Sequence, residues 1–472
     1  MGKAWVKRWS PHRNGGKGSL VPVLSIHRKT SIEKMQWSLP PSKSHAIRWL
    51  TLAAQSQQEV VLRGMEHAGQ DVISMRRCLV QMGVSVSDLD RDGQPLTVST
   101  NDDDQPANGT ASWKVTGVGP NGLHPPISVL HAGNSGTSLR ILMALVSLHH
   151  APVMVDGDAS LRSRSYNAML SSFEQLGVAC SKGTDAEGLP FLIQGPINPD
   201  VPLHLDVGSS SQPTTAWCLA APGFSSVLEV HFEGDPVSRR HAALTMEMCE
   251  ATGSGPLSEG ALRPWQPTFP TNEVIVPRDC SMLGFAFLAV QALQSEVLVE
   301  AMPLPEDSLG HELLFDIATS LGITVSDTHL KPTPNAKRID IDLRDANDLI
   351  TPLAATLALG AGGLIHGAPH AAHKETNRLT GTVSLLKQFG LESNVEGDGL
   401  RVPGGQRLST PTAPVQTYSD HRMQMTALIL AAACEEEVLV EGPSLHTVAD
   451  PDAVERLRAC GVEIEARLHQ PW

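Results

Sequence analysis

The sequence predicts a mixed α/β protein in which one unit of helices and strands recurs about six times. Six short polar clusters each open an apolar helix, and successive clusters are separated by roughly 65 to 90 residues, a period typical of internal duplication. Short runs of β-branched and aliphatic residues lie between the helices. A chain of 472 residues is also too long for one ordinary hydrophobic core, so two domains are expected.

The first polar cluster lies within residues 39–54, LPPSKSHAIRWLTLAA. The chain turns at the two prolines, because proline fits neither a helix interior nor a central strand. Ser42 is a favourable N-cap, and apolar residues follow it at helical spacing. Lys43, Ser44 and Arg48 then lie in the first turns, where free N–H groups and the helix dipole favour an anion. Taken alone, the pattern also fits a capped surface helix with solvated charges; its recurrence favours the anion site.

Five further clusters follow the same plan: Gly133-Asn134-Ser135-Gly136-Thr137, Gly208-Ser209-Ser210-Ser211-Gln212, Asp279-Cys280-Ser281, Asp345-Ala346-Asn347-Asp348 and Ser419-Asp420-His421-Arg422. Second helices are expected at 167–177, 241–253 and 376–390, each ending at a glycine as helix C-termini often do. Strands are expected at 153–155, 227–232, 297–300 and 438–441. A segment rich in Pro and Gly, 253–272, follows the third unit and predicts a domain junction that divides the units three and three.

The composition narrows the class of protein. Fifty acidic residues against 36 basic ones give a net charge of −14, which argues against binding to nucleic acid or to an anionic membrane. The 7 cysteines are scattered without metal-ligand spacing, and no apolar run is long enough to span a membrane. These features favour a cytoplasmic protein with reduced thiols. Residues 1–34 are basic and lack a secretory h-region; a floppy extension is the favoured interpretation, and a plastid-type transit segment stays open.

Basic residues gather at and just beyond the predicted helix starts. In the run 373–379, HKETNRL, Lys374 and Arg378 would share one face of a helix, and like charges there favour a bound anion. Acids such as Asp348 and Glu375 are interleaved with the cations, a combination suited to proton transfer beside bound phosphate or carboxylate. Solvated charged faces and simple N-capping by the serines stay open as alternatives. There is no Walker A loop and no G-x-G-x-x-G fingerprint, so nucleotide use has no support.

Six motifs in this order resemble those of the enolpyruvyl transferase family, in its 5-enolpyruvylshikimate-3-phosphate (EPSP) synthase branch. They are LPPSKSHAIR (39–48), GNSGTSLR (133–140), GDASLRSRS (157–165), SSSQ (209–212), HKETNRL (373–379) and YSDHRM (418–423). The resemblance implies a two-lobed α/β fold, an inside-out α/β barrel of six βαβαββ units with three per lobe. It implies an N-terminal extension at 1–20, one lobe at 43–276, and a second lobe formed by 21–42 and 277–472.

The resemblance also implies a reaction, the transfer of the enolpyruvyl group of phosphoenolpyruvate to the 5-hydroxyl of shikimate-3-phosphate with release of phosphate. No cofactor, metal, nucleic acid or membrane is expected, the partners are small anionic substrates, and the protein is expected to be a monomer. Asp348 resembles the base, and Lys43 and Glu375 resemble the groups that exchange protons with the enolpyruvyl carbon and the leaving phosphate. The shikimate-3-phosphate side would comprise Ser44, Arg48, Ser210, Ser211, Gln212, Ser238, Asp348 and Lys374. The phosphoenolpyruvate side would comprise Lys43, Gly136, Arg140, Arg164, Arg378 and Arg422.

The sequence departs from the family pattern at several positions. Val448 stands where a lysine that binds phosphoenolpyruvate is expected, and Asn377, Ser165, His241 and His370 replace other common residues. Val448 keeps a second hypothesis open, a paralogue that acts on another acceptor or without phosphoenolpyruvate. A non-catalytic anion sensor is a third hypothesis. A UDP-N-acetylglucosamine enolpyruvyl transferase is a fourth, but the S-K-S sequence at the first helix and the lack of an assignable loop cysteine argue against it.

Overall fold

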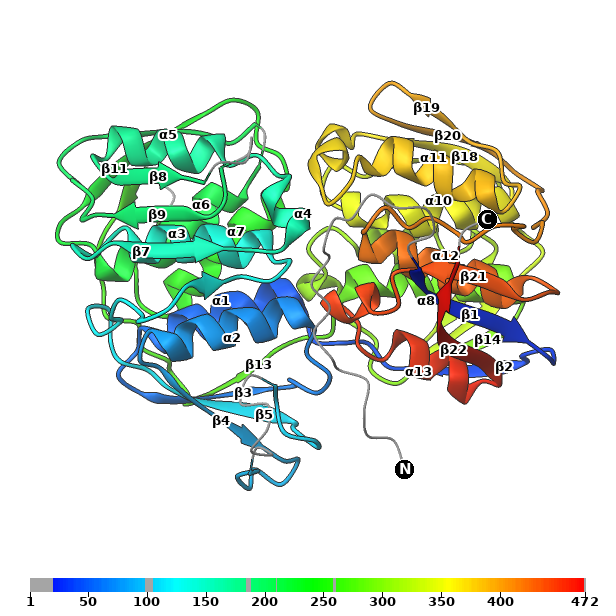
Figure 1. The fold of residues 1–472 in the computed structure, drawn as a ribbon, viewed down its shortest axis with the longest axis horizontal. Coiled ribbons are helices and arrows are strands. Elements are labelled where there is room, and N and C mark those ends of the chain that lie inside the picture. The colour runs from blue at the N-terminus through cyan, green and yellow to red at the C-terminus, as the bar shows by residue number, and fades with distance from the viewer. Residues whose placement is uncertain (1–19, 98–104, 184–187, 209, 258–259, 471–472) are drawn as a thin grey trace.

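The computed structural model describes residues 20–97, 105–183, 188–208, 210–257 and 260–470, which form two lobes side by side (Figure 1). Of the predicted N-terminal extension, only Leu20 lies within these ranges, and Ser209 of the third polar cluster lies outside them. The predicted mixed α/β class is confirmed, because helices and strands alternate along the described chain. No helix in these ranges is long and apolar enough to cross a membrane.

The first lobe holds three of the six sheets found in the described residues, ordered β13-β3-β5-β4, β6-β7-β9-β8 and β10-β11-β12. Its strands are β3 (Glu59–Arg63), β4 (Ser85–Leu89), β5 (Ser112–Thr116), β6 (Leu130–His131), β7 (Val153–Asp156), β8 (Ala179–Lys182), β9 (Phe191–Gln194), β10 (Leu203–Asp206), β11 (Leu228–Glu233), β12 (Ala261–Leu262) and β13 (Glu273–Ile275). Its helices are α1 (Lys43–Ala54), α2 (Gln70–Gln81), α3 (Gly136–Val146), α4 (Ala159–Arg162), α5 (Asn167–Gln175), α6 (Gln212–Ala220), the 3₁₀ turn η1 (Ala221–Gly223) and α7 (Arg239–Ala251).

The second lobe holds the other three sheets, ordered β15-β16-β14-β2, β17-β18-β20-β19 and β21-β1-β22. Its strands are β1 (Val21–Arg28), β2 (Lys34–Trp37), β14 (Glu296–Val299), β15 (Ile323–Ser326), β16 (His329–Pro332), β17 (Ile339–Asp342), β18 (Gly362–His366), β19 (Asn394–Glu396), β20 (Gly399–Pro403), β21 (Val438–Glu441) and β22 (Val462–His469). Its helices are α8 (Cys280–Leu293), η2 (Pro305–Asp307), α9 (Leu313–Ile317), η3 (Asn347–Leu349), α10 (Ile350–Leu359), η4 (Pro369–His373), α11 (Arg378–Gln388), α12 (His421–Ala433), η5 (Leu445–Val448) and α13 (Ala453–Ala459).

The chain crosses between the two lobes twice, and the strand beside each crossing pairs within its own lobe. Strand β2, which precedes the first lobe in sequence, pairs in parallel with β14 of the second lobe. Strand β13, which ends the first lobe, pairs in parallel with β3. The two crossings lie side by side, since the Ser42 amide donates to the Pro277 carbonyl (2.8 Å) and the Asp279 amide donates to the Pro40 carbonyl (2.9 Å). The starts of α1 and α8 are therefore held together. We propose 43–276 as the first lobe, with 21–42 and 277–470 as the described part of the second.

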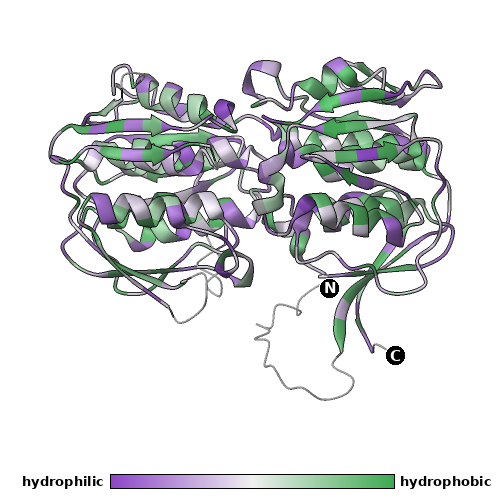
Figure 2. Ribbon diagram, turned by 90° about the horizontal axis from the view of Figure 1, so that it is seen from above, coloured by the Kyte–Doolittle hydropathy of each residue, from purple (hydrophilic) through white to green (hydrophobic). Residues whose placement is uncertain are grey.

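Each lobe has its own hydrophobic core. Helices α3 and α6 pack in the first core, and α8, α10 and α12 pack in the second. Helix α8 is apolar on nearly every face, as expected for a fully buried helix. Its Gly284 permits close packing, because a Cβ there would lie 2.7 Å from Leu349 Cδ2. Figure 2 shows the lobes from above, with hydrophobic residues along the strands and helices of each.

Most predicted helix starts are confirmed, but two local expectations were wrong. Helix α11 begins only at Arg378, so Lys374 lies in the preceding loop and does not share a helix face with it. The reason is Asn377, which is the N-cap of α11. Its side-chain oxygen accepts a hydrogen bond from the Leu379 amide (3.1 Å), so the helix starts after it. Ser42 precedes α1 as predicted, but its hydroxyl contacts His45 Nδ1 (2.8 Å) instead of capping a backbone amide.

Candidate active site

The helix starts of both lobes meet at a small cavity of about 20 Å³. Lys43, Ser44 and His241 line it from the first lobe; the second lobe adds residues that include Asp279, Ser281, His311, Asp348 and Arg422. The cavity has room for about one water molecule in this arrangement of the lobes. A larger hollow of about 480 Å³ on the first lobe is lined by Gln57, Phe224 and Trp265 among others, and none of the described residues in its wall is charged.

Arg378 lies at the centre of a network of buried charged side chains beside the cavity. Its side chain is 1% exposed, and it donates to Asp420 Oδ2 (2.9 Å), Asp348 Oδ1 (2.6 Å) and Glu375 Oε2 (2.7 Å). Burial lowers the pKa of Arg378, but the three carboxylates outweigh it and raise that pKa above its usual value. Arg378 is therefore a permanent cation that joins three acids from three separate chain segments.

Asp348 lies among three cations. Besides Arg378, two further cations lie near Asp348 Oδ1. Arg422 Nε is 3.4 Å and Lys374 Nζ is 3.9 Å from this oxygen. Burial raises the pKa of Asp348, but Arg422, Lys374 and Arg378 together hold it well below the usual value. The carboxylate is therefore ionised, and the side chain, 24% exposed, can accept a proton from a group bound beside it.

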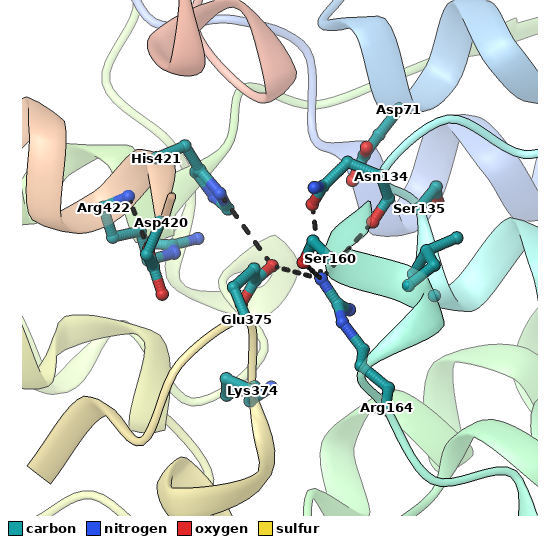
Figure 3. Close-up of polar contacts among 12 residues, drawn as sticks. Asp71, Asn134, Ser135, Ser160, Arg164, Lys374, Glu375, Asp420, His421 and Arg422 are labelled. Carbon is teal, nitrogen blue, oxygen red and sulfur yellow. Dashed lines mark hydrogen bonds and ion pairs between the residues drawn. The ribbon is translucent and has the colours of Figure 1, made fainter. Parts of the chain in front are cut away.

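Glu375 connects the two lobes (Figure 3). Its Oε1 lies 3.1 Å from Arg164 Nη2 of the first lobe, and the same guanidinium donates to Ser160 Oγ (3.1 Å) and Asn134 Oδ1 (3.3 Å). Burial raises the pKa of Glu375, but Arg378 and Arg164 outweigh it and hold the pKa well below the usual value. Glu375 is therefore the acid through which the Arg164 guanidinium of the first lobe contacts the second lobe.

Lys43 is paired with an acid that the sequence interpretation missed. Its Nζ lies 3.0 Å from Asp71 Oδ2, and its side chain is 28% exposed. Burial lowers the pKa of Lys43, but Asp71, Asp348 and Glu375 outweigh it and raise the pKa. Burial raises the pKa of Asp71. The sequence feature that could have indicated Asp71 is its position in the first turn of α2, where the helix dipole favours an acid.

A second basic group lies near the start of α3. Arg140 donates to Gln212 Oε1 (2.7 Å) and to the Ser165 carbonyl (2.8 Å). A Cβ at Gly136 would lie 2.9 Å from Arg164 Nη1 and 3.1 Å from Arg140 Nη1, so glycine permits both guanidinium groups to approach the helix start. Burial lowers the pKa of Arg140 to about 10, which still leaves it charged at neutral pH.

Four of the predicted binding residues lie apart from this network in the described chain. Arg48 is 2% exposed and donates to Thr245 Oγ1, Thr215 Oγ1 and the carbonyls of Ser44 and His241, so the first lobe itself occupies its donors. No hydrogen bond joins the side chains of Ser210, Ser211 or Ser238 to the charged cluster within the described ranges. Ser238 has φ +49°, an uncommon conformation for a residue other than glycine.

The chain is similar to known proteins of one family. The sequence matches the family model for EPSP synthase (3-phosphoshikimate 1-carboxyvinyltransferase) over residues 34–457. Proteins of Bradyrhizobium diazoefficiens and Methanocorpusculum labreanum, both named 3-phosphoshikimate 1-carboxyvinyltransferase, are 27% and 29% identical to it. Those alignments cover 90% of this chain, and 90% and 96% of the two relatives. The structure resembles that of EPSP synthase from Acinetobacter baumannii, with a TM-score of 0.71 and 20% identity over 94% of this chain and 100% of the other. The predicted fold is confirmed by this similarity.

Proposed function

Because this chain belongs to the EPSP synthase family, we propose that it transfers the enolpyruvyl group of phosphoenolpyruvate to the 5-hydroxyl of shikimate-3-phosphate. The observation that carries the proposal is the meeting of cations and carboxylates from both lobes at one place. Lys43 and Arg164 come from the first lobe, and Lys374, Arg378 and Arg422 from the second. Buried ion pairs add little net stability, because the cost of removing the charges from water offsets their attraction, so a cluster of them favours a role in binding anions.

The reaction consists of an addition followed by an elimination. The oxygen of the 5-hydroxyl forms a bond to C2 of phosphoenolpyruvate while a proton is added to C3, which gives a tetrahedral intermediate. Loss of a proton from C3 and cleavage of the C2–O bond to phosphate then give the enolpyruvyl ether and inorganic phosphate. Asp348 is proposed to take the proton of the 5-hydroxyl, and Glu375 and Lys43 to exchange protons with C3 and the leaving phosphate. The surrounding cations stabilise the charge of the intermediate.

The anionic substrates compete with the acids that now pair with the cations. A phosphate or carboxylate can replace Glu375 as the partner of Arg164 when the lobes open, and can bind Lys43 and Lys374, whose side chains are 28% and 27% exposed. Arg378 pairs with three carboxylates. We therefore propose two roles for it, binding phosphoenolpyruvate and holding Asp348 and Glu375 in place.

The direct experiment mixes the purified protein with shikimate-3-phosphate and phosphoenolpyruvate. Release of phosphate should be stoichiometric with the enolpyruvyl product, detected by ¹H and ³¹P NMR, and either substrate alone should release none. A folded protein that binds shikimate-3-phosphate but gives no product with phosphoenolpyruvate would overturn the proposed reaction.

We also propose that the protein acts in the cytoplasm as a monomer. The seven cysteines are all free in the structure, which suits a reducing compartment. Sedimentation equilibrium would test the oligomeric state, because a dimer would have twice the chain mass of 50.4 kDa.

Val448 offers a test of how phosphoenolpyruvate is bound. It ends η5 beside the start of α2, since a Cβ at Gly69 would lie 2.6 Å from the Val448 carbonyl oxygen. Val448→Lys would add a cation beside the start of α2, whose first turn carries Asp71. We expect the KM for phosphoenolpyruvate to fall about 10-fold, which corresponds to about 1.5 kcal/mol for a hydrogen bond to a charged group. Val448→Met, with similar length and no charge, is the matched control and should leave KM unchanged. An unchanged KM in the lysine variant would mean that this position lies outside the binding site for phosphoenolpyruvate.

A further inference from the structure

His311 is a buried residue that no motif in the sequence indicated. It follows a tight turn in which Leu309 has φ +55° and Gly310 has φ +97°. A Cβ at Gly310 would lie 2.9 Å from Asp345 Cβ, so both the conformation and the close approach require glycine. The turn holds the His311 ring, 4% exposed, in the wall of the cavity between the lobes.

Hydrogen bonding fixes the tautomer of the His311 ring. Nδ1 lies 2.7 Å from the carbonyl oxygen of Ser308. A carbonyl only accepts, so Nδ1 carries the hydrogen and Nε2 presents a lone pair. Nε2 is buried and has no hydrogen-bond partner among the described residues. Burial lowers the pKa of His311, which keeps the ring neutral at physiological pH despite nearby Asp348 and Asp279.

The lone pair on His311 Nε2 determines which ligand group can bind to it. The ligand must bring a hydrogen-bond donor, because a neutral imidazole nitrogen with a lone pair can only accept. Phosphoenolpyruvate at neutral pH offers ionised oxygens and no hydroxyl, whereas shikimate-3-phosphate carries free ring hydroxyls. The cations that line the same cavity already have partners. Lys43 pairs with Asp71, and Arg422 contacts Asp348 and Ser281.

We propose that His311 Nε2 accepts a hydrogen bond from a ring hydroxyl of the acceptor substrate and so helps to determine which acceptor is bound. The inference rests on the proposed function, and it adds a residue outside the six motifs. Asp348 lies in the same cavity wall, so the two residues would contact the hydroxyl-bearing part of one ring, with Asp348 as the base and His311 as a neutral acceptor.

Two substitutions distinguish the role of Nε2 from that of Nδ1. In His311→Asn the side-chain amide can still donate to the Ser308 carbonyl, as Nδ1 does, but no atom reaches the position of Nε2. In His311→Gln the longer side chain places an amide oxygen near that position. We expect His311→Asn to weaken binding of shikimate-3-phosphate about 3- to 10-fold, as for loss of one hydrogen bond. His311→Gln should stay within about 3-fold of the native protein, and the KM for phosphoenolpyruvate at saturating acceptor should not change.

Deoxy analogues identify the hydroxyl and exclude a general structural effect. Calorimetric titration of the native protein with 4-deoxy- and 5-deoxy-shikimate-3-phosphate should show weaker binding for the analogue that lacks the partner of His311. In His311→Asn, removal of that same hydroxyl from the ligand should weaken binding by less than it does in the native protein. Equal losses in the native protein and the variant for both analogues would overturn the inference, as would native affinity in His311→Asn. Failure of the proposed function is distinct, since it would appear as absent turnover in the native protein.

Discussion

Asp348→Asn is expected to lower kcat by about 100- to 10,000-fold, the usual contribution of a positioned general base. The asparagine side chain has nearly the same shape, but it cannot take the proton of the acceptor hydroxyl. In the structure Arg422, Lys374 and Arg378 hold the pKa of Asp348 well below its usual value. A bound anion beside these cations would raise that pKa toward the working pH and make the carboxylate a stronger base when both substrates are present.

Steady-state phosphate release measures this effect, and a titration with shikimate-3-phosphate checks that the variant still binds its acceptor. Asp340→Asn is the matched control, because Asp340 is an exposed acid on β17 of the same lobe and should keep native kcat. If Asp348→Asn retained more than about a tenth of native kcat, another group would have to serve as the base.

Arg378→Met is expected to destabilise the protein by about 3–5 kcal/mol, the range observed when one partner of a buried ion pair is removed. The change leaves Asp348, Glu375 and Asp420 close together without their shared cation. Arg401→Met is the matched control, since Arg401 pairs with Glu396 on the surface, with both side chains at least 40% exposed. That variant should lose no more than about 1 kcal/mol. Urea denaturation of the three proteins would measure the difference.

The loss in Arg378→Met should also depend on pH in a defined direction. In the native protein the pKa values of Asp348 and Glu375 lie well below their usual values, so both stabilise the fold above their unfolded pKa values near 4. That stabilisation disappears as pH falls through the lower folded-state pKa values. The gap between the native protein and the variant should therefore be largest at neutral pH and shrink below about pH 4. A gap that stayed constant from pH 7 to pH 3 would contradict the ionic explanation.

Local structure was readable in the sequence because it depends on residues a few positions apart. The polar clusters before α3, α8 and α12 open helices as predicted, and in each a side-chain oxygen, from Ser135, Asp279 or Asp420, accepts from a backbone amide two or three residues later. The order of six motifs along the chain indicated the family and the fold. Asn377 shows the limit of such reasoning, because a motif that suggested a helix over 374–378 contains the residue that starts the helix later.

The sequence alone therefore determined the mixed α/β class, most of the helix starts and the family. The tertiary structure decided which charged groups pair. Arg378 is shared by Asp348 and Asp420, 30 and 42 residues away in the chain, and Arg48 is held inside the first lobe by Thr215 and Thr245. His311 reaches the cavity through a turn with no sequence motif. The physical reason is that ion pairing and the loss of hydration depend on three-dimensional distance and burial, whereas helix capping and hydrophobic periodicity depend on neighbours along the chain.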